Sequence, residues 1–422
     1  MHYKKKILRS GLRVISIPNK DSLATTILVL VEAGSKYETK KINGLSHFLE
    51  HMCFKGTTRR PRAIDITSEL DSLGAQYNAF TSHEYTGYYA KVESRHFDKV
   101  LGVVSDLYQN PLFDECEIEK EKGVVIEEIN MYEDLPQKKV QDLVTELLYG
   151  DQPAGWSIAG DKETIKILTK ADFLKYRGEH YVASATTIVV AGKFNEETIF
   201  KKLEDKFKNV AEGKKFGKTK TKEEQNKPMI LVKHKKSDQT HLVLAFRAYD
   251  TYDKRNYTLD LLAHILGGSM SSRLFQRIRE EMGAAYYVRT STDTFTDHGY
   301  LEIAAGVDNT RVHDVIVAIL DECRKLCETS VSNRELQMFK DSMIGNMVLG
   351  LETSDAVANF YGGQEILKKA IDNPLEFANR IQKVTSKDIM KEAVAIFRND
   401  KLNLALIGPF ETEEHFAKIL HL

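Results

Sequence analysis

The sequence predicts an α+β protein built from two related halves. Each half alternates short strands with long helices, such as the helix expected over residues 336–349. Hairpin-like links, as at Asp297-His298-Gly299, indicate antiparallel strands. A repeat at an offset of 214 residues pairs the strand at 24–35 with the strand at 238–249, and the helices that follow pair at the same offset. We therefore expect an α/β sandwich in each half.

The boundary between the halves lies in residues 212–228. This segment is rich in lysine, glycine and polar residues, and Phe216 is its lone aromatic residue. At 422 residues the chain exceeds the size at which one core usually divides, and 42% hydrophobic residues suffice for packing. We expect an N-terminal domain at residues 1–212, a linker at 213–228 and a C-terminal domain at 229–422.

Composition argues against several classes of protein. The 60 Lys and Arg against 61 Asp and Glu leave almost no net charge, so we expect no nucleic-acid partner. The longest apolar run, residues 26–31, has the length of a strand, so we expect no membrane span. The N-terminal lysine cluster is followed at once by Arg9 and Ser10 rather than by an apolar stretch, which favours a cytoplasmic protein. The four cysteines, including Cys53 next to the motif described below, lack the spacing of a metal cluster.

Residues 44–52 carry the order H-x-x-E-H, which is typical of an inverted zinc-protease motif. On a helix His47 and His51 lie one turn apart, and Glu50 lies within roughly 100° of both. Two imidazoles can hold Zn²⁺ while leaving a position for water, and Glu50 can accept a proton from that water. The apolar residues of this segment gather on the opposite side of the helix; they are Leu45, Phe48, Leu49 and Met52. The alternative is a polar helix face that carries two histidines by chance.

A catalytic zinc site usually has three protein ligands, so the motif predicts a third donor elsewhere. Residues 115–133, read as a helix, place Glu121 and Glu128 on the inward arc and Glu127 on the far side. We expect Glu128 to be the third ligand. Glu121, two turns earlier, would support the site from behind or approach the metal during turnover. The alternative is a pair of salt-bridged carboxylates.

These residues resemble the M16, or pitrilysin-type, zinc peptidases, and within them the branch of mitochondrial processing peptidase. The family pattern is H-x-x-E-H, 76 intervening residues and a glutamate, and 76 residues lie between His51 and Glu128. The family also has an acidic residue seven positions before the third ligand, here Glu121. The resemblance covers almost the whole chain. It implies one Zn²⁺ per chain and, in each domain, a largely antiparallel sheet with helices packed on one face.

The C-terminal half resembles a degenerate copy of the N-terminal half. At the offset of 214, Leu261, His264 and Ile265 stand where the first half has His47, Glu50 and His51. Only the first half should therefore bind zinc. The resemblance implies that the second half shapes the substrate cleft.

Two further segments resemble functional parts of the family. Residues 74–82, with Asn78, Ala79 and Phe80, resemble the edge strand that binds substrate, where an extended peptide can pair by its main chain. The alternative is an ordinary strand with a polar face. Arg279 and Tyr286 match the pair that reaches the scissile carbonyl and steadies the developing oxyanion in the family. Without the resemblance they would be a surface arginine and a packed tyrosine.

The expected function is that of a zinc-dependent endopeptidase cleaving unfolded peptides, and the resemblance implies that it acts inside a chamber enclosed by two chains, with the Arg/Tyr pair contributed across their interface. Because the chain carries the zinc motif and the Arg/Tyr pair, a homodimer is the simplest expectation, and a heterodimer with an inactive M16-like chain is the alternative. The competing function is a non-catalytic scaffold or peptide-binding subunit. Glu50 argues against this, and against a purely structural zinc site, because neither needs a base.

Overall fold

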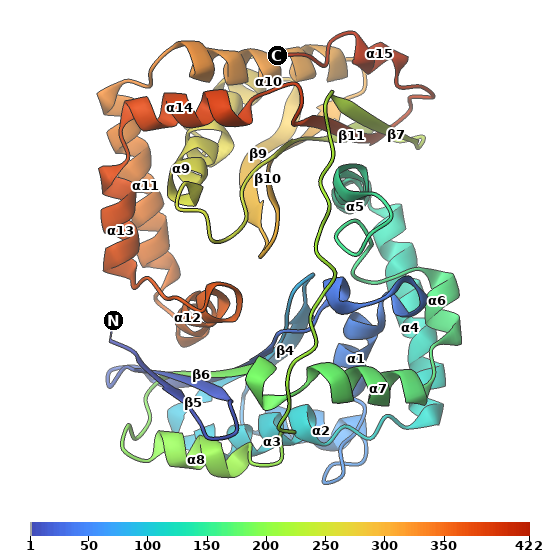
Figure 1. Cartoon of the computed structure of the whole chain (residues 1–422), viewed down its shortest axis with the longest axis vertical. Helices are drawn as coiled ribbons and strands as arrows, with labels where there is room; N and C mark the ends of the chain where they lie inside the picture. Colours follow the sequence, from blue (N-terminus) through green and yellow to red (C-terminus); the bar gives the residue numbers. More distant parts are fainter. Residues whose placement is uncertain (1) are drawn as a thin grey trace. The chain divides into compact units, whose positions relative to one another are not determined.

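The computed structural model describes residues 2–422 and confirms the α+β class (Figure 1). Its residues pack into two compact units, each assembled from three segments of the chain. The first unit comprises residues 1–129, 157–219 and 348–373, and the second comprises 130–156, 220–347 and 374–422. The domain limits expected from the sequence divide the chain according to its repeat, and they stay a prediction. The two compact units are defined by packing instead, and each contains segments from both sides of those limits.

The first unit is built around a six-stranded sheet of order β1-β2-β6-β3-β5-β4, in which only the β2–β6 pair is parallel. Its strands are β1 (Lys4–Ile7), β2 (Arg13–Pro18), β3 (Ala24–Val31), β4 (Gln76–Thr81), β5 (Thr86–Glu93) and β6 (Thr186–Gly192). Its helices are α1 (Leu45–Cys53), α2 (Ala63–Ser72), α3 (Phe97–Gln109), most of α4 (Glu115–Asp134), α6 (Lys162–Ile167), α7 (Lys170–His180), α8 (Ile199–Lys206) and α12 (Ser354–Lys368).

The second unit repeats this plan with the sheet order β7-β11-β8-β10-β9, in which only β7–β11 is parallel. Its strands are β7 (Met229–His234), β8 (Gln239–Arg247), β9 (Ala285–Thr294), β10 (Gly299–Asp308) and β11 (Leu402–Gly408). Its helices are α5 (Pro136–Tyr149), α9 (Asn256–Gly267), α10 (Val312–Glu328), most of α11 (Asn333–Gly350), α13 (Pro374–Lys383), α14 (Ser386–Ile396) and α15 (Glu414–Ala417). Strand β8 and helix α9 stand where the offset of 214 places the counterparts of β3 and α1.

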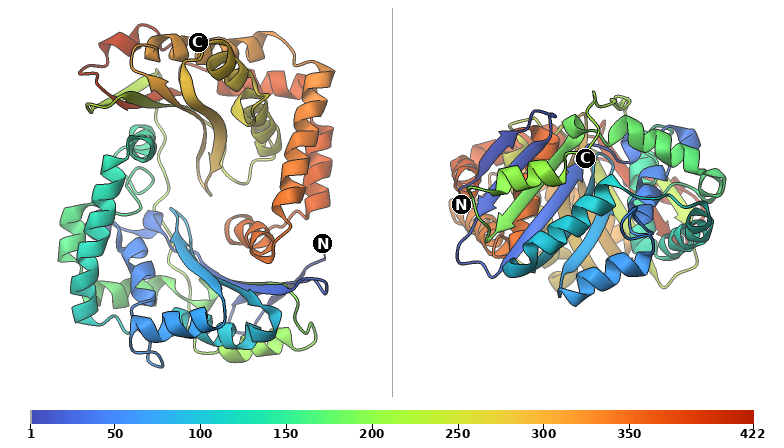
Figure 2. Two further views of the ribbon diagram at one scale, coloured as in Figure 1. Left: turned by 180° about the vertical axis from the view of Figure 1, so that it is seen from behind. Right: turned by 90° about the horizontal axis from the view of Figure 1, so that it is seen from below.

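Alternation along β3 separates the two faces of the first sheet. Ile27, Val29 and Val31 join the core formed with α1 and α3. The opposite face meets α12 (Figures 1 and 2). Leu28 and Leu30 pack there against the helix at Gly362. The helices of each sequence half thus cover one face, as expected, and one helix from the other half covers the second face.

The second sheet is covered in the same way. Leu242, Leu244 and Phe246 of β8 pack with α9 and α10, whereas Val243 and Ala245 join a separate cluster with α5. Because α5 comes from the first half of the sequence and α12 from the second, the halves exchange one helix each. This exchange makes both sheets buried on two faces, so their central strands are apolar at successive positions.

The linker, residues 213–228, forms no helix or strand but is bound along its length. Within the first unit Lys215 pairs with Glu32 and Lys218 pairs with Glu84, both buried carboxylates. Within the second unit Glu223 pairs with Arg247 at 2.9 Å. These two lysines of the linker therefore neutralise buried charge. Among the helices of residues 2–422, none is long and apolar enough to cross a membrane.

The packing of α12 predicts a difference between two adjacent glycines. A Cβ atom at Gly362 would lie 2.8 Å from Leu30 Cδ1 and 3.1 Å from Val189 Cγ2, whereas one at Gly363 would meet nothing within 4 Å. We expect Gly362→Leu to lower the free energy of unfolding by about 1–3 kcal/mol through overpacking. Gly363→Leu is the matched control and should leave stability unchanged or raise it by up to about 1 kcal/mol. Urea denaturation measures both, and equal losses would contradict the packing.

His180 predicts a pH dependence of stability. It is 4% exposed, at the end of α7, with its ring centroid 4.4 Å from that of Tyr176. Burial lowers the pKa of His180 from 6.5 to about 4. Between these pH values the unfolded chain binds a proton that the folded chain does not, so stability present above pH 6.5 is lost as the pH falls toward 4. At about 1.4 kcal/mol per pKa unit, the contribution of His180 is about 3 kcal/mol.

The variant His180→Phe should remove this contribution. The free energy of unfolding, measured by urea titration at pH 7 and at pH 4, should fall less in the variant than in the unaltered chain. An identical fall in both proteins would show that His180 is not the group responsible.

Candidate metal centre and active site

Helix α1 carries the H-x-x-E-H residues, and its N-cap is Gly44, whose φ of 95° lies in the left-handed region that glycine favours. Its apolar face is fully buried, as the helical pattern predicts. That face consists of Leu45, Phe48, Leu49 and Met52. The burial of this side leaves the polar side, with His47, Glu50 and His51, directed away from the core.

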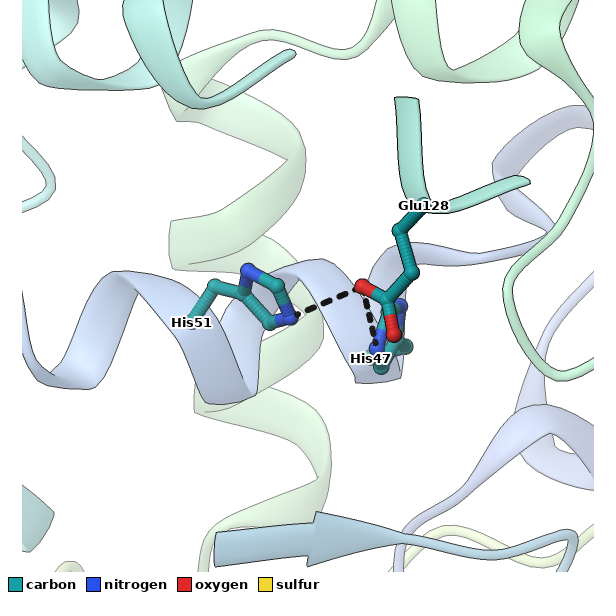
Figure 3. A group of neighbouring side chains, drawn as sticks. All are labelled: His47, His51 and Glu128. Atoms are coloured by element: carbon teal, nitrogen blue, oxygen red, sulfur yellow. Dashed lines mark ion pairs between the residues drawn. The ribbon is translucent and has the colours of Figure 1, made fainter. Parts of the chain in front are cut away.

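The structure brings His47 and His51 of α1 together with Glu128 of α4 (Figure 3). Glu128 Oε2 lies 3.6 Å from His47 Nε2 and 3.5 Å from His51 Nε2. In a tetrahedral zinc site with bonds of about 2.0–2.1 Å, ligand atoms lie about 3.3 Å apart. Two imidazole nitrogens and one carboxylate oxygen at these separations form a donor set that fits a zinc ion. Glu127 is exposed, as the helical pattern predicts.

A second carboxylate of α4 holds His51 from behind. Glu121 is buried, and its Oε1 lies 2.9 Å from His51 Nδ1. Its Oε2 lies 2.5 Å from Lys55 Nζ. The hydrogen bond to Nδ1 fixes the ring and directs Nε2 toward the other donors, which is the usual arrangement behind a metal-binding histidine.

Glu50 lies beside these residues and is bound to the edge strand of the sheet. Thr81, the last residue of β4, donates a hydrogen bond of 2.6 Å from Oγ1 to Glu50 Oε2. Strand β4 also contains Asn78, Ala79 and Phe80, and in the described part of the chain it pairs with β5 on one side only. The expected edge strand is therefore an edge strand, and its end contacts the carboxylate of the motif.

Burial and neighbouring charges shift the pKa values at this site. Burial and, to a smaller extent, the charge of His51 together lower the pKa of His47 to about 4. Burial also acts to lower the pKa of His51, but the hydrogen bond to Glu121 and the charge of Glu128 outweigh it and the pKa rises. Burial raises the pKa of Glu50, against the hydrogen bond from Thr81. His47 is thus neutral, as a metal ligand must be, and the carboxylates stabilise positive charge beside it.

Arg279 and Tyr286 come together in the second unit. Arg279 lies in a π-helical turn, Phe275–Glu281, and its Nη1 donates a hydrogen bond of 2.8 Å to the carbonyl oxygen of Tyr286 in β9. Its guanidinium carbon lies 5.6 Å from the centroid of the Tyr286 ring. Tyr286 is 73% exposed, so it is not the packed tyrosine of the simpler interpretation. Tyr286 has a hydroxyl, and Arg279 has N–H groups besides the one bound to the Tyr286 carbonyl, that can donate hydrogen bonds at the surface of this unit.

The corresponding helix of the second unit lacks the donor set. Leu261 and Ile265 of α9 are fully buried where His47 and His51 have their counterparts. His264, the counterpart of Glu50, lies 3.1 Å from Ser342 Oγ through Nε2. The second unit thus keeps the helix but has core residues in the positions of the two histidines.

Sequence reasoning missed the contacts made by Lys55 and by Thr81. Lys55 lies two residues past the end of α1, and its partner Glu121 is distant in the sequence, so no local pattern indicates this contact. Thr81 was placed in the substrate strand, but its bond to Glu50 joins positions 31 residues apart and has no local signal.

The fold and the site together define a two-repeat α+β protein of the metallopeptidase type. Two family models match: that of the insulinases (peptidase family M16) over residues 13–162, and that of the peptidase M16 inactive domain over residues 168–343. The chain belongs to peptidase family M16.

Similar proteins span nearly the full chain. An uncharacterized zinc protease of Bacillus subtilis, YmxG, is 36% identical over 96% of this chain and 98% of its own length. An uncharacterized zinc protease of Rickettsia felis is 34% identical, covering 95% and 96%. The crystal structure of a protease from Helicobacter pylori superposes with a TM-score of 0.91 at 21% identity, over 97% of this chain and 99% of that one. This structural likeness supports the fold.

Proposed function

We propose that this chain is a zinc-dependent endopeptidase that cleaves unfolded peptides. The observation that carries the proposal is that His47 Nε2, His51 Nε2 and Glu128 Oε2 lie close together. Glu50 directly precedes His51 on the same helix and adds a carboxylate beside them. The names of the relatives, zinc proteases, support the same assignment.

His47, His51 and Glu128 would hold one zinc ion per chain. Three protein donors leave a coordination position open, as in catalytic rather than structural zinc sites. Zinc bound there would supply a water of lowered pKa and polarise a peptide carbonyl. Glu121 and Lys55 would keep the ring of His51 in the orientation that this binding needs.

Glu50 is the proposed general base. Its Oε2 accepts the hydrogen bond from Thr81, which fixes the plane of the carboxylate and leaves Oε1 to take a proton from water. Burial raises the pKa of Glu50, which brings it closer to neutrality and strengthens it as a base. The same carboxyl group can return the proton to the amine that leaves.

The free edge of β4 is the proposed peptide-binding element. An extended peptide could pair with it through main-chain hydrogen bonds around Asn78, Ala79 and Phe80. Only unfolded segments can offer an extended main chain in this way, so stably folded proteins should be poor substrates. Main-chain pairing depends little on the substrate sequence. Any sequence preference would come from pockets that bind the side chains of the peptide.

Arg279 and Tyr286 are the proposed donors to the oxyanion. Each can donate a hydrogen bond to the oxygen on which negative charge develops. We propose that two copies of the chain form a homodimer that encloses a chamber, and that this pair acts on the active site of the other copy. A heterodimer with an inactive M16-like chain is the alternative.

A second candidate function is a non-catalytic scaffold or peptide-binding subunit. It is favoured by the description of the second family model, an inactive domain, and by the buried Leu261 and Ile265 in the ligand positions of the second unit. The first unit disfavours it, because a scaffold has no use for a carboxylate bonded by Thr81 beside an intact donor set.

The catalytic role of Glu50 gives the first test. We expect Glu50→Gln to lose activity on an unstructured quenched-fluorescent peptide by at least about 10²–10⁴-fold, since an amide cannot accept the proton. Zinc content, measured on the same samples, should stay unchanged. Glu117→Gln is a suitable control, because Glu117 lies on α4 and pairs only with Lys120 among the ion pairs of the described residues. An unaltered chain that binds zinc but cleaves none of a varied peptide pool would favour the scaffold function.

The exchange of Arg279 between copies gives a second prediction. Arg279→Ala and Glu50→Gln should each be inactive alone, the former by about 10²–10³-fold. Mixed dimers would contain one site with both Glu50 and Arg279, so an equal mixture should regain about a quarter of the wild-type rate, since half of random pairs are mixed. Peptide cleavage after subunit exchange measures this. A mixture as inactive as its parts would show that the residues act within one chain.

A further inference from the structure

The two histidines of the donor set are held in different ways. His51 is fixed through its ring, because Nδ1 is bonded to Glu121. His47 Nδ1 is buried and has no hydrogen-bond partner among residues 2–422. No side chain therefore orients the His47 ring through its second nitrogen, and the ring direction depends on where the backbone of the first turn of α1 is placed.

That first turn is held by Glu38, a residue outside the motif. Glu38 is 4% exposed and follows the short 3-10 helix η1 (Ser35–Tyr37). Its Oε1 accepts a hydrogen bond of 2.6 Å from the backbone N–H of Ser46, and its Oε2 accepts one of 2.8 Å from that of Gly44. Oε2 also accepts a bond of 3.0 Å from Asn43 Nδ2. The carboxylate thus takes backbone donors that have no acceptor within a helix.

This arrangement replaces an ordinary helix cap. The residue at the N-cap position, Gly44, has no side chain, and a Cβ there would lie 2.6 Å from the carbonyl oxygen of Ala159. A serine or aspartate cap therefore cannot stand at this position without displacing the chain. Glu38 supplies the capping oxygens from six residues upstream, and a carboxylate at a helix N-terminus is also favoured by the helix dipole.

Further hydrogen bonds hold the first turn of α1 against neighbouring parts of the first unit. Asn43 Nδ2 donates to the carbonyl oxygen of Ser157 at 3.1 Å, and Ser46 Oγ lies 2.7 Å from Tyr176 Oη. Ser46 directly precedes His47 in the chain. The hydrogen bond from the Ser46 N–H to Glu38 therefore fixes the backbone next to the first histidine of the donor set. Burial raises the pKa of Glu38 to about 7, and its N–H donors act against that rise.

We infer that Glu38 is a positioning residue of the zinc site, which fixes His47 through the first turn of α1 as Glu121 fixes His51 through its ring. The inference rests on the proposed zinc site and goes beyond it by assigning a function to a residue that touches neither metal nor substrate. Glutamine at position 38 would present one oxygen and one NH₂ group, so one backbone N–H would lose its acceptor.

The test compares three variants with the unaltered full-length chain. Zinc affinity is measured by competition with a chelator, the ligand field by the visible spectrum of the cobalt-substituted protein, and stability by thermal unfolding of the metal-free chain. Glu38→Gln tests the inference, and Glu121→Gln serves as the comparison for a residue behind a ligand. Glu32→Gln is the control, because Glu32 is a buried carboxylate of the same unit that pairs with Arg13 at 2.7 Å and contacts neither α1 nor α4 in the described interactions.

We expect Glu38→Gln and Glu121→Gln each to weaken zinc binding by about 10–100-fold and to change the cobalt spectrum. Glu32→Gln should lower the unfolding temperature without either effect. Unchanged zinc affinity and spectrum in folded Glu38→Gln would overturn the inference, and so would an equal loss of affinity in Glu32→Gln. Failure of the unaltered chain to bind zinc would overturn the proposed function as well, which distinguishes the two.

Discussion

The geometry of the site depends on a helix of nine residues that must be buried on one face and polar on the other. A helix this short is not stable alone, so α1 exists because Phe48 and Leu49 are packed in the core and because its first turn is capped. Once α1 is fixed, the spacing of four residues places His47 and His51 on adjacent turns. The burial of one face therefore determines the position of the chemistry on the other.

The polar face of α1 gathers several carboxylates in a partly buried site. Glu128, Glu121 and Glu50 all approach it, and Lys55 pairs with Glu121. Carboxylates gathered in this way are stabilised best by a cation that several of them share. The electrostatics and the geometry thus favour the same occupant, a divalent metal between the two imidazoles and Glu128.

The second unit shows that the fold does not need the donor set. The same strand order and the same helix are kept while Leu261 and Ile265 replace the histidines and extend the core. Stability in each unit comes instead from the sheet, which is covered on its second face by a helix from the other half. The site is therefore an addition to a scaffold whose packing is complete without it.

The parts of the structure that follow a regular period could be predicted from the sequence. The turn spacing located His47, His51 and Glu50 on one face, and the same reasoning selected Glu128 and Glu121 from α4. The exchange of α5 and α12 could not be predicted, because an amphipathic pattern shows that a helix is buried but not against which sheet.

The contacts made by loops could not be predicted from the sequence either. Glu38 lies in an irregular segment where no period marks an inward side chain, and the lysines of the linker look solvated until their buried partners are known.

In the proposed mechanism, strand β4 links substrate binding to the base. Its free edge can accept a peptide, and its last residue, Thr81, already holds Glu50 by a hydrogen bond of 2.6 Å. A peptide paired with β4 would be placed in register with the same backbone that orients Glu50. The distance between the scissile carbonyl and the base would then be set by one strand, whatever the side chains of the peptide. Such an arrangement reconciles accurate placement with weak dependence on sequence, because the hydrogen bonds that align the substrate are made by its main chain.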